Sequence, residues 1–233
     1  MLIALFSSES ENGMSASPDL KSLTNTLVSV AYPELQKNEI VTSWGQTSSY
    51  GQVRWSDDDD TIQIRVNKAV GAWHQAGITG LLSHELSHPS QKGSGLKERE
   101  TDEDVISRGL GPYLAVERLL AGKYEDHIIQ RGKDRYLGYR SIRNLLSQKE
   151  IRNLDLLLSN LKLKPAKTSH RSSFSHDSIV YEKDGISTIA IDGETFVIPQ
   201  GMIDPDIKIV NREGIVSVYA DEKIIGQYEE FEF

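Results

Sequence analysis

Apolar and polar positions in the first part of the chain follow the two spacings that distinguish helices from strands. From residue 19 to 30, apolar residues recur every three or four positions behind Ser17-Pro18, which predicts a helix. Short strands are expected at 38–44 and 51–55. Residues 61–67 alternate between apolar and polar side chains, which predicts a strand with one buried face.

The pattern becomes helical again from about residue 79, where leucines and two histidines precede Pro89. Because the residue before a proline avoids helical backbone angles, we expect this helix to end at Pro89, with His88 in its last turn. A loop rich in glycine and serine follows at residues 91–96. Further helices are predicted in three segments, 97–108, 113–120 and 137–163, the last holding one or two of them.

The character of the chain changes beyond a polar linker at residues 165–177. Turn residues such as Asp192-Gly193 separate short segments rich in β-branched and aromatic residues. These segments are expected strands at 179–181, 187–191, 195–198, 207–210, 215–219 and 223–228. The pattern therefore predicts a first domain at 1–164, a linker at 165–177 and a small all-β domain at 178–233.

Composition excludes several kinds of site and partner. There is no cysteine, so any metal must be held by nitrogen and oxygen ligands. The net charge is −8, and residues 178–233 hold 12 Asp/Glu against 4 Lys/Arg, so this acidic segment disfavours a nucleic-acid partner. No apolar run reaches about 20 residues, and the apolar start lacks a basic region. We therefore expect no membrane span, no secretory signal and an intracellular location.

Two segments are candidates for binding a cation. The four aspartates at 57–60 are expected to form a solvated turn, with calcium binding as the alternative, because the EF-hand spacing is missing. The stronger candidate is His84-Glu85-Leu86-Ser87-His88. Histidines four residues apart on a helix share a face and can hold one metal ion. Glu85 would flank that ion, where a carboxylate can act as general base and then general acid. The alternative is a polar helix face without a metal.

The helix expected at residues 97–108, directly after the helix with the histidines, supplies a third ligand for zinc. A short loop makes the two helices antiparallel neighbours, so the first turn of the second helix lies beside the histidines. Glu98 can then complete the site, and Asp102, four residues on, can accept the N–H of His84. Glu100 is the alternative ligand, with Asp104 as its partner, and an Asp ligand also stays open.

These two helices together resemble those of the gluzincin metallopeptidases, the clan that includes thermolysin. In that clan a Glu-x-x-x-Asp pattern follows His-Glu-x-x-His, and Glu98-Arg99-Glu100-Thr101-Asp102 matches it. The resemblance implies an α+β, zincin-like core, with helices packed on a small antiparallel sheet. It implies a zinc-dependent peptidase with His84, His88 and Glu98 as metal ligands, Glu85 as the catalytic residue, and a peptide or protein as substrate.

The resemblance also implies two features of substrate handling. The strand at 61–67 would offer an exposed edge to which a peptide could add as a further strand. A donor should stabilise the oxyanion that forms during hydrolysis. The candidates for this donor are four residues after the catalytic helices, His127, Tyr136, Tyr139 and Arg140, each of which also has a plain packing or surface interpretation.

The segment 189–228 resembles the small β-barrel that closes Mu-type transposases. Its strands and Gly-containing turns follow that order, although no transposase carboxylate triad precedes them and the segment is acidic. We therefore expect a small barrel that is structural or binds a protein partner. The alternative function for the chain is a non-catalytic zinc-binding scaffold that acts through this barrel; hydrolysis of a different amide or ester is a third hypothesis.

Overall fold

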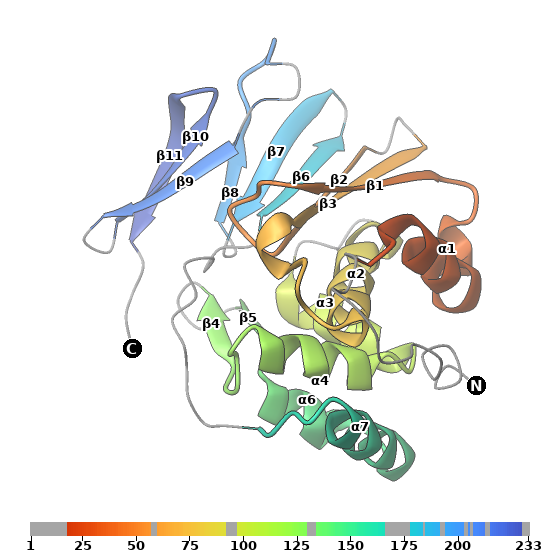
Figure 1. Ribbon diagram of the computed structural model, residues 1–233. Helices are drawn as coiled ribbons and strands as arrows, with labels where there is room; N and C mark the ends of the chain where they lie inside the picture. Colours follow the sequence, from red (N-terminus) through yellow and green to blue (C-terminus); the bar gives the residue numbers. More distant parts are fainter. Residues whose placement is uncertain are drawn as a thin grey trace.

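The computed structural model describes residues 18–56, 60–91, 97–129, 134–165, 178–183, 185–191, 194–202, 205, 207–212 and 215–229. In Figure 1 the helices lie on one face of a twisted sheet, and a second, smaller sheet stands beside its far end. Most of the expected aspartate turn (57–59), of the loop (92–96) and of the linker (166–177) lies outside the described residues. The described helices and sheets make the chain a mixed α+β protein.

The main sheet has six strands in the order β1-β3-β2-β6-β7-β8. The three expected N-terminal strands are confirmed as β1 (Glu39–Gly45), β2 (Gly51–Ser56) and β3 (Thr61–Asn67). Burial of Ile62, Ile64 and Val66 follows the predicted alternation in β3.

The expectation of an antiparallel sheet is wrong, because β1 pairs with β3 in parallel and β2 pairs with β6 in parallel. The expected free edge of residues 61–67 is also wrong, since β3 is hydrogen-bonded to β1 on one side and β2 on the other. Alternation within a strand shows which face is buried; it does not show which strands lie beside it.

Six helices are found in the described residues, and all of them lie within or close to the predicted helical segments. Helix α1 (Leu20–Ala31) is capped by Asp19, whose carboxylate accepts from the backbone N–H groups of Lys21 and Ser22. The others are α2 (Gln75–Ser90), α3 (Glu98–Ser107), α4 (Gly111–Leu120), α6 (Tyr139–Leu145) and α7 (Gln148–Asn160). Short 3₁₀ turns occur at η2 (Pro33–Leu35) and η3 (Lys68–Val70).

Helix α2 does not end at Pro89 as expected, because it continues to Ser90. A proline near the end of a helix removes only a hydrogen bond of the last turn, and here the N–H of Gln91 donates to the carbonyl of His88 and closes the helix. Packing also holds α2 in place. A Cβ at Gly80 would overlap the backbone carbonyl of Tyr113, so only glycine allows α2 and α4 to approach this closely.

All six expected C-terminal strands are confirmed, but they do not form a barrel. Strands β6 (Ser178–Lys183), β7 (Ile186–Ile191) and β8 (Glu194–Val197) extend the main sheet from β2. Strands β9 (Ile207–Arg212), β10 (Ile215–Ala220) and β11 (Lys223–Glu229) form a separate antiparallel sheet. Within the described residues neither sheet closes on itself. Short alternating strands are common to barrels and open sheets, so their pattern could not distinguish the two.

Buried apolar side chains form two clusters. The larger one joins the helices to β2 and β3 and includes Leu82, Leu86 and Leu114. The smaller one lies among the C-terminal strands around Val180, Ile189 and Val218. The division into domains at 165–177 stays a prediction. Among the described residues, no helix has both the length and the apolar character needed to cross a bilayer.

The structure adds one hairpin that the pattern did not predict. Strands β4 (His127–Ile129) and β5 (Asp134–Tyr136) pair in antiparallel fashion next to α3. They are only three residues each, too short to show an alternation. This hairpin contributes to the candidate site described below.

Candidate metal centre

Helix α2 carries the two histidines through the interior of the protein. Its residues from Ala76 to His88 are all buried, and it packs against α3, α4 and β2. Leu82 and Leu86 belong to the larger apolar cluster, which places His84 and His88 together on the other side of the helix. His84 and His88 are 2% and 1% exposed.

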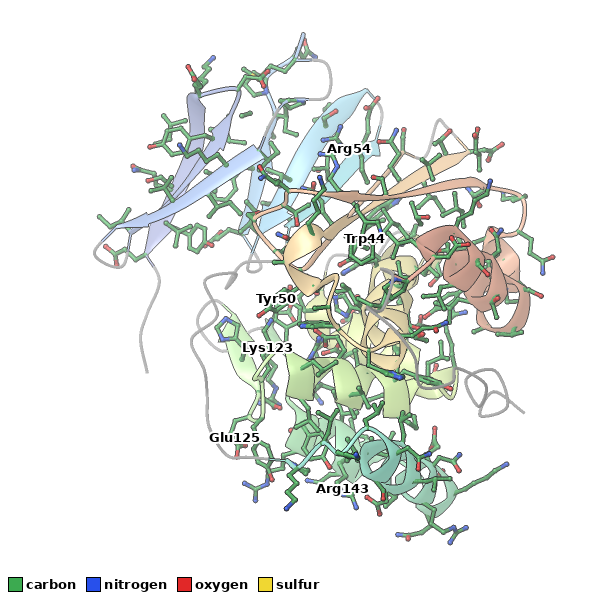
Figure 2. The ribbon with its side chains drawn as sticks, in the orientation of Figure 1. Trp44, Tyr50, Arg54, Lys123, Glu125 and Arg143 are labelled. Atoms are coloured by element: carbon green, nitrogen blue, oxygen red, sulfur yellow. The ribbon has the colours of Figure 1, made fainter. Side chains whose placement is uncertain are left out.

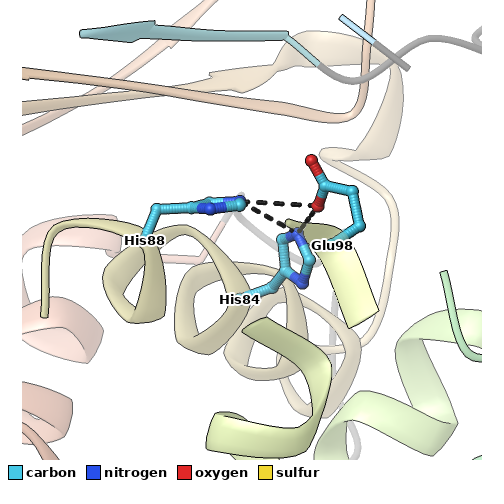
Figure 3. Close-up of side chains that lie close together, drawn as sticks. All are labelled: His84, His88 and Glu98. Atoms are coloured by element: carbon cyan, nitrogen blue, oxygen red, sulfur yellow. Dashed lines mark hydrogen bonds and ion pairs between the residues drawn. The ribbon is translucent and has the colours of Figure 1, made fainter. Parts of the chain in front are cut away.

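Helix α3 brings Glu98 to the same place, as predicted. Glu98 is the first residue of α3 and is 4% exposed. Its Oε2 atom lies 3.0 Å from Nε2 of His84 and 3.6 Å from Nε2 of His88, and the two Nε2 atoms are 3.2 Å apart (Figure 3). Among the described residues this is the group of histidine and acidic side chains that could hold a metal ion.

The separations of these atoms fit ligands of a single metal ion. Four ligands at about 2.0–2.2 Å from a zinc ion lie roughly 3.3 Å from one another. The three observed separations, 3.0, 3.2 and 3.6 Å, scatter around that value. Calcium and magnesium prefer all-oxygen sites, whereas two imidazoles and a carboxylate suit zinc and other transition metals. The group therefore has the donors and the spacing for a transition-metal ion.

Asp102 lies within hydrogen-bond distance of His84. Its Oδ1 atom lies 2.9 Å from Nδ1 of His84 and 2.8 Å from a guanidinium nitrogen of Arg118, and its Oδ2 accepts from the N–H of Leu137 at 2.7 Å. Burial alone would raise the pKa of Asp102, but Arg118 and His84 outweigh it and hold the pKa below its usual value. An ionised Asp102 makes Nδ1 of His84 a donor and leaves Nε2 for a metal.

The site favours positive charge. Burial alone would lower the pKa of His84, but its hydrogen bonds with Asp102 and Glu98 outweigh burial and hold the pKa well above its usual value. Two buried carboxylates therefore stabilise a cation at this position. A divalent ion held by His84 and Glu98 would satisfy the same electrostatic demand.

His88 and α3 are positioned by further polar contacts. The hydroxyl of Thr101 lies 3.3 Å from Nδ1 of His88 and donates to the carbonyl of Lys97. Asp134 accepts from the backbone N–H groups of Glu98 and Arg99 at 2.9 and 3.1 Å and so caps the first turn of α3. Because Asp134 is the first residue of β5, this cap holds the hairpin β4–β5 next to Glu98.

The expected alternative ligand lies elsewhere. Glu100 forms an ion pair with Lys97 at 2.8 Å on the surface of α3. Its partner in the alternative pattern, Asp104, forms an ion pair with Arg108 at 2.7 Å. The structure thus brings Glu98 and Asp102, and not Glu100 and Asp104, to the histidines.

Glu85 is buried on the sheet side of the site and is not part of the metal-binding group. Its carboxylate lies against Gly51, the first residue of β2, where a Cβ would overlap it. At the other end of β2, the ring of Trp55 is stacked parallel to the ring of His88 with centroids 6.5 Å apart. Strand β2 therefore borders the site from Glu85 to His88.

The four oxyanion candidates separate into two groups. Tyr136 is buried, and its ring lies 5.8 Å from the ring of His84 and 6.4 Å from the ring of His127. Tyr139 contacts Arg143, and Arg140 pairs with Glu125 on the surface. Only Tyr136 and His127 are linked to the metal-binding group by these contacts.

Two residues of the site were not predicted from the sequence. Arg118 holds Asp102, and Asp134 holds the start of α3. Arg118 is 3% exposed, donates to the carbonyl of Leu137 and also pairs with Glu117. An arginine within an apolar helix segment was the available signal, since a buried arginine needs a carboxylate partner. Asp134 carried no such signal.

Comparisons of this chain with protein-family models, with curated proteins and with solved structures found no match.

Proposed function

We propose that the protein is a zinc-dependent peptidase in which His84, His88 and Glu98 hold the metal. The observation that carries the proposal is the convergence of Nε2 of His84, Nε2 of His88 and Oε2 of Glu98, with all three side chains buried. Three protein ligands leave the fourth tetrahedral position for water or substrate, which is the arrangement of catalytic zinc sites. When bound, zinc lowers the pKa of water toward about 7 and polarises a carbonyl group.

Glu85 supports a hydrolytic role over a structural one. A metal site that only stabilises the fold does not need a carboxylate beside its ligands, and Glu85 is buried there without being part of the group of His84, His88 and Glu98. In the proposed reaction Glu85 takes a proton from the attacking water. It then passes that proton to the nitrogen of the leaving amine as the C–N bond breaks.

Tyr136 and His127 are the proposed donors to the oxyanion. Their rings are stacked with centroids 6.4 Å apart, and the ring of Tyr136 also lies beside the ring of His84. A phenol O–H or an imidazole N–H near the metal can stabilise the negative charge that develops on the carbonyl oxygen.

The decisive experiment combines metal analysis with cleavage of a peptide library. Protein purified from zinc-containing medium should hold one zinc per chain, and Glu85→Gln should keep that zinc while losing peptide cleavage by at least about 10³-fold. Protein that takes up no transition metal would overturn the proposal. Tight binding of iron in place of zinc would point to a different chemistry for the same ligands, since two histidines and one carboxylate also suit iron.

The same experiment separates the alternatives. If the wild-type chain holds zinc but cleaves no peptide and no simple amide or ester, the zinc-binding scaffold becomes the better account. If it cleaves amides or esters and no peptide, the site is a hydrolase of another class. Loss of zinc in Glu85→Gln would make Glu85 a ligand and contradict its role as a base.

A further inference from the structure

A lysine ammonium lies among aromatic rings beside the candidate metal centre. Lys123 follows the end of α4, and its Nζ atom is 4.8 Å from the centroid of the Tyr136 ring and 5.8 Å from that of the Tyr50 ring. Figure 2 shows Tyr50 and Lys123 close together beneath the sheet. The ring of Trp73 lies 5.0 Å from that of Tyr50 and extends the aromatic surface. Contacts with aromatic faces hold a lysine ammonium in place without neutralising its charge.

Both tyrosines connect Lys123 to the site. The ring of Tyr136 lies 5.8 Å from the ring of His84, which is one of the three metal-binding side chains. Tyr50 directly precedes Gly51, against which the carboxylate of Glu85 is packed. The two tyrosines that contact the ammonium therefore lead to the metal-binding side chains on one side and toward Glu85 on the other.

The charge of Lys123 is not matched by a carboxylate of the described part of the chain. Nearby acidic side chains have other partners: Glu125 pairs with Arg140, and Asp126 pairs with Arg135, each at 3.5 Å. Arg118, a second cation near Tyr136, is engaged by Asp102. Lys123 and Tyr50 are each half-buried, so a ligand can approach the ammonium while part of its water shell is already removed.

We propose that Lys123 is a specificity residue that binds a carboxylate of the substrate, so that the preferred substrates are peptides carrying a carboxylate close to the cleaved bond. The inference rests on the proposed peptidase function. The carboxylate can come from the C-terminus of the peptide or from an Asp or Glu side chain. The rings of Tyr50 and Trp73 supply the apolar wall against which the neighbouring part of the substrate packs.

The test uses the best-cleaved library peptide, resynthesised in four forms. Two forms differ at the C-terminus, as free acid or amide, and two differ in the side chain beside the cleaved bond, as Glu or Gln. The readout is the ratio of kcat/KM between each carboxylate form and its neutral counterpart. Lys123→Met should lower one of the two ratios by about tenfold or more, and Lys123→Arg should retain most of it. Lys149→Met, on the surface of α7, is the matched control and should leave both ratios unchanged.

The pair of forms whose kcat/KM ratio falls identifies the source of the carboxylate, either the C-terminus or the side chain. Equal rates for acidic and neutral peptides in the wild-type chain would overturn the inference. An equal fall on all four forms in Lys123→Met would also overturn it, because Lys123 would then act on the reaction and not on a substrate carboxylate.

A binding measurement keeps this inference separate from the proposed function. Glu85→Gln, which should not cleave the peptides, can be titrated calorimetrically with the same four forms, with and without Lys123→Met. If the wild-type chain cleaves nothing, the four forms are made from the library peptide that it binds most tightly. Weaker binding of only the carboxylate form in the double variant then still supports the inference. Unchanged binding of every form would overturn it, whatever the outcome of the cleavage assay.

Discussion

Gly51 at the start of β2 lies directly against the carboxylate of Glu85 in α2. A Cβ at residue 51 would overlap the Oε1 atom of Glu85 and approach its Cδ and Cγ. The position of the proposed general base is therefore set by the sheet as well as by its own helix. A glycine on the sheet leaves the space that Glu85 occupies, and any larger residue must displace the carboxylate.

Gly51→Ala should therefore impair catalysis without affecting metal binding. A displacement of about 1 Å in a catalytic group can reduce the rate about 10²-fold. We expect a fall of this order in kcat with zinc content unchanged. Gly45→Ala is the matched control, because its Cβ would meet the flexible Arg65 side chain at 2.6 and 2.8 Å, away from the site. Full activity in Gly51→Ala would contradict the role assigned to Glu85.

Substituting the two glutamates of the first turn of α3 should distinguish the metal ligand from its neighbour. Glu98→Gln removes the carboxylate next to both histidines, and we expect loss of stoichiometric zinc and of the thermal stabilisation that zinc provides. Glu100→Gln removes a surface partner of Lys97 and should retain one zinc. Zinc content is measured by metal analysis after dialysis. The stabilisation by zinc is measured by thermal unfolding with and without a chelator. The opposite pattern would make Glu100 the ligand.

Arg118 should control zinc affinity through Asp102. Without the guanidinium, Asp102 loses its ion pair and holds His84 less firmly, and such outer contacts typically change metal affinity by about 10- to 100-fold. We expect Arg118→Lys to weaken zinc binding within this range in a competition assay with a chelator.

Arg118→Met should be less stable by about 3–5 kcal/mol, since it leaves Asp102 and Glu117 buried without their cation. Arg143→Met is the control, because Arg143 forms an ion pair with the exposed Asp155 far from the metal group. If zinc affinity is the same in Arg118→Lys and Arg143→Met, Arg118 does not position the site.

Two buried tyrosines should make the fold sensitive to alkaline pH. Burial raises the pKa of Tyr113 from 10.0 to about 12 and raises that of Tyr32 further. The hydroxyl of Tyr32 donates to the carbonyl of Ser83 at 2.7 Å. Because both folded-state pKa values are raised, their contribution to stability is complete below about pH 10 and is lost as the pH rises above it.

Absorbance titration of the nine tyrosines should show at least two that ionise only well above pH 10 or on unfolding. Tyr32→Phe removes one of them and the hydrogen bond to Ser83, at a cost of about 1 kcal/mol near neutral pH. The loss of unfolding free energy above pH 10 should be shallower in this variant. Titration of all nine together near pH 10, with the fold intact, would contradict the burial of Tyr32 and Tyr113.

The site was predictable where its geometry is local. His84 and His88 share a helix face because four residues make about one turn, and Asp102 follows Glu98 by the same spacing. The strand at 61–67 was predictable for the same reason, since the alternation in β3 directly reflects side-chain burial.

The sequence by itself thus determined most of the segments that are helices or strands, and which side chains share a face of each. Tertiary structure decided how those faces meet. It placed Glu98 rather than Glu100 against the histidines, joined Arg118 and Asp134 to the site, put Gly51 against Glu85, and paired β6 with β2 instead of closing a barrel. The physical reason is that spacing along one element follows from backbone geometry, whereas the register between elements depends on packing and hydrogen bonding among residues far apart in the chain.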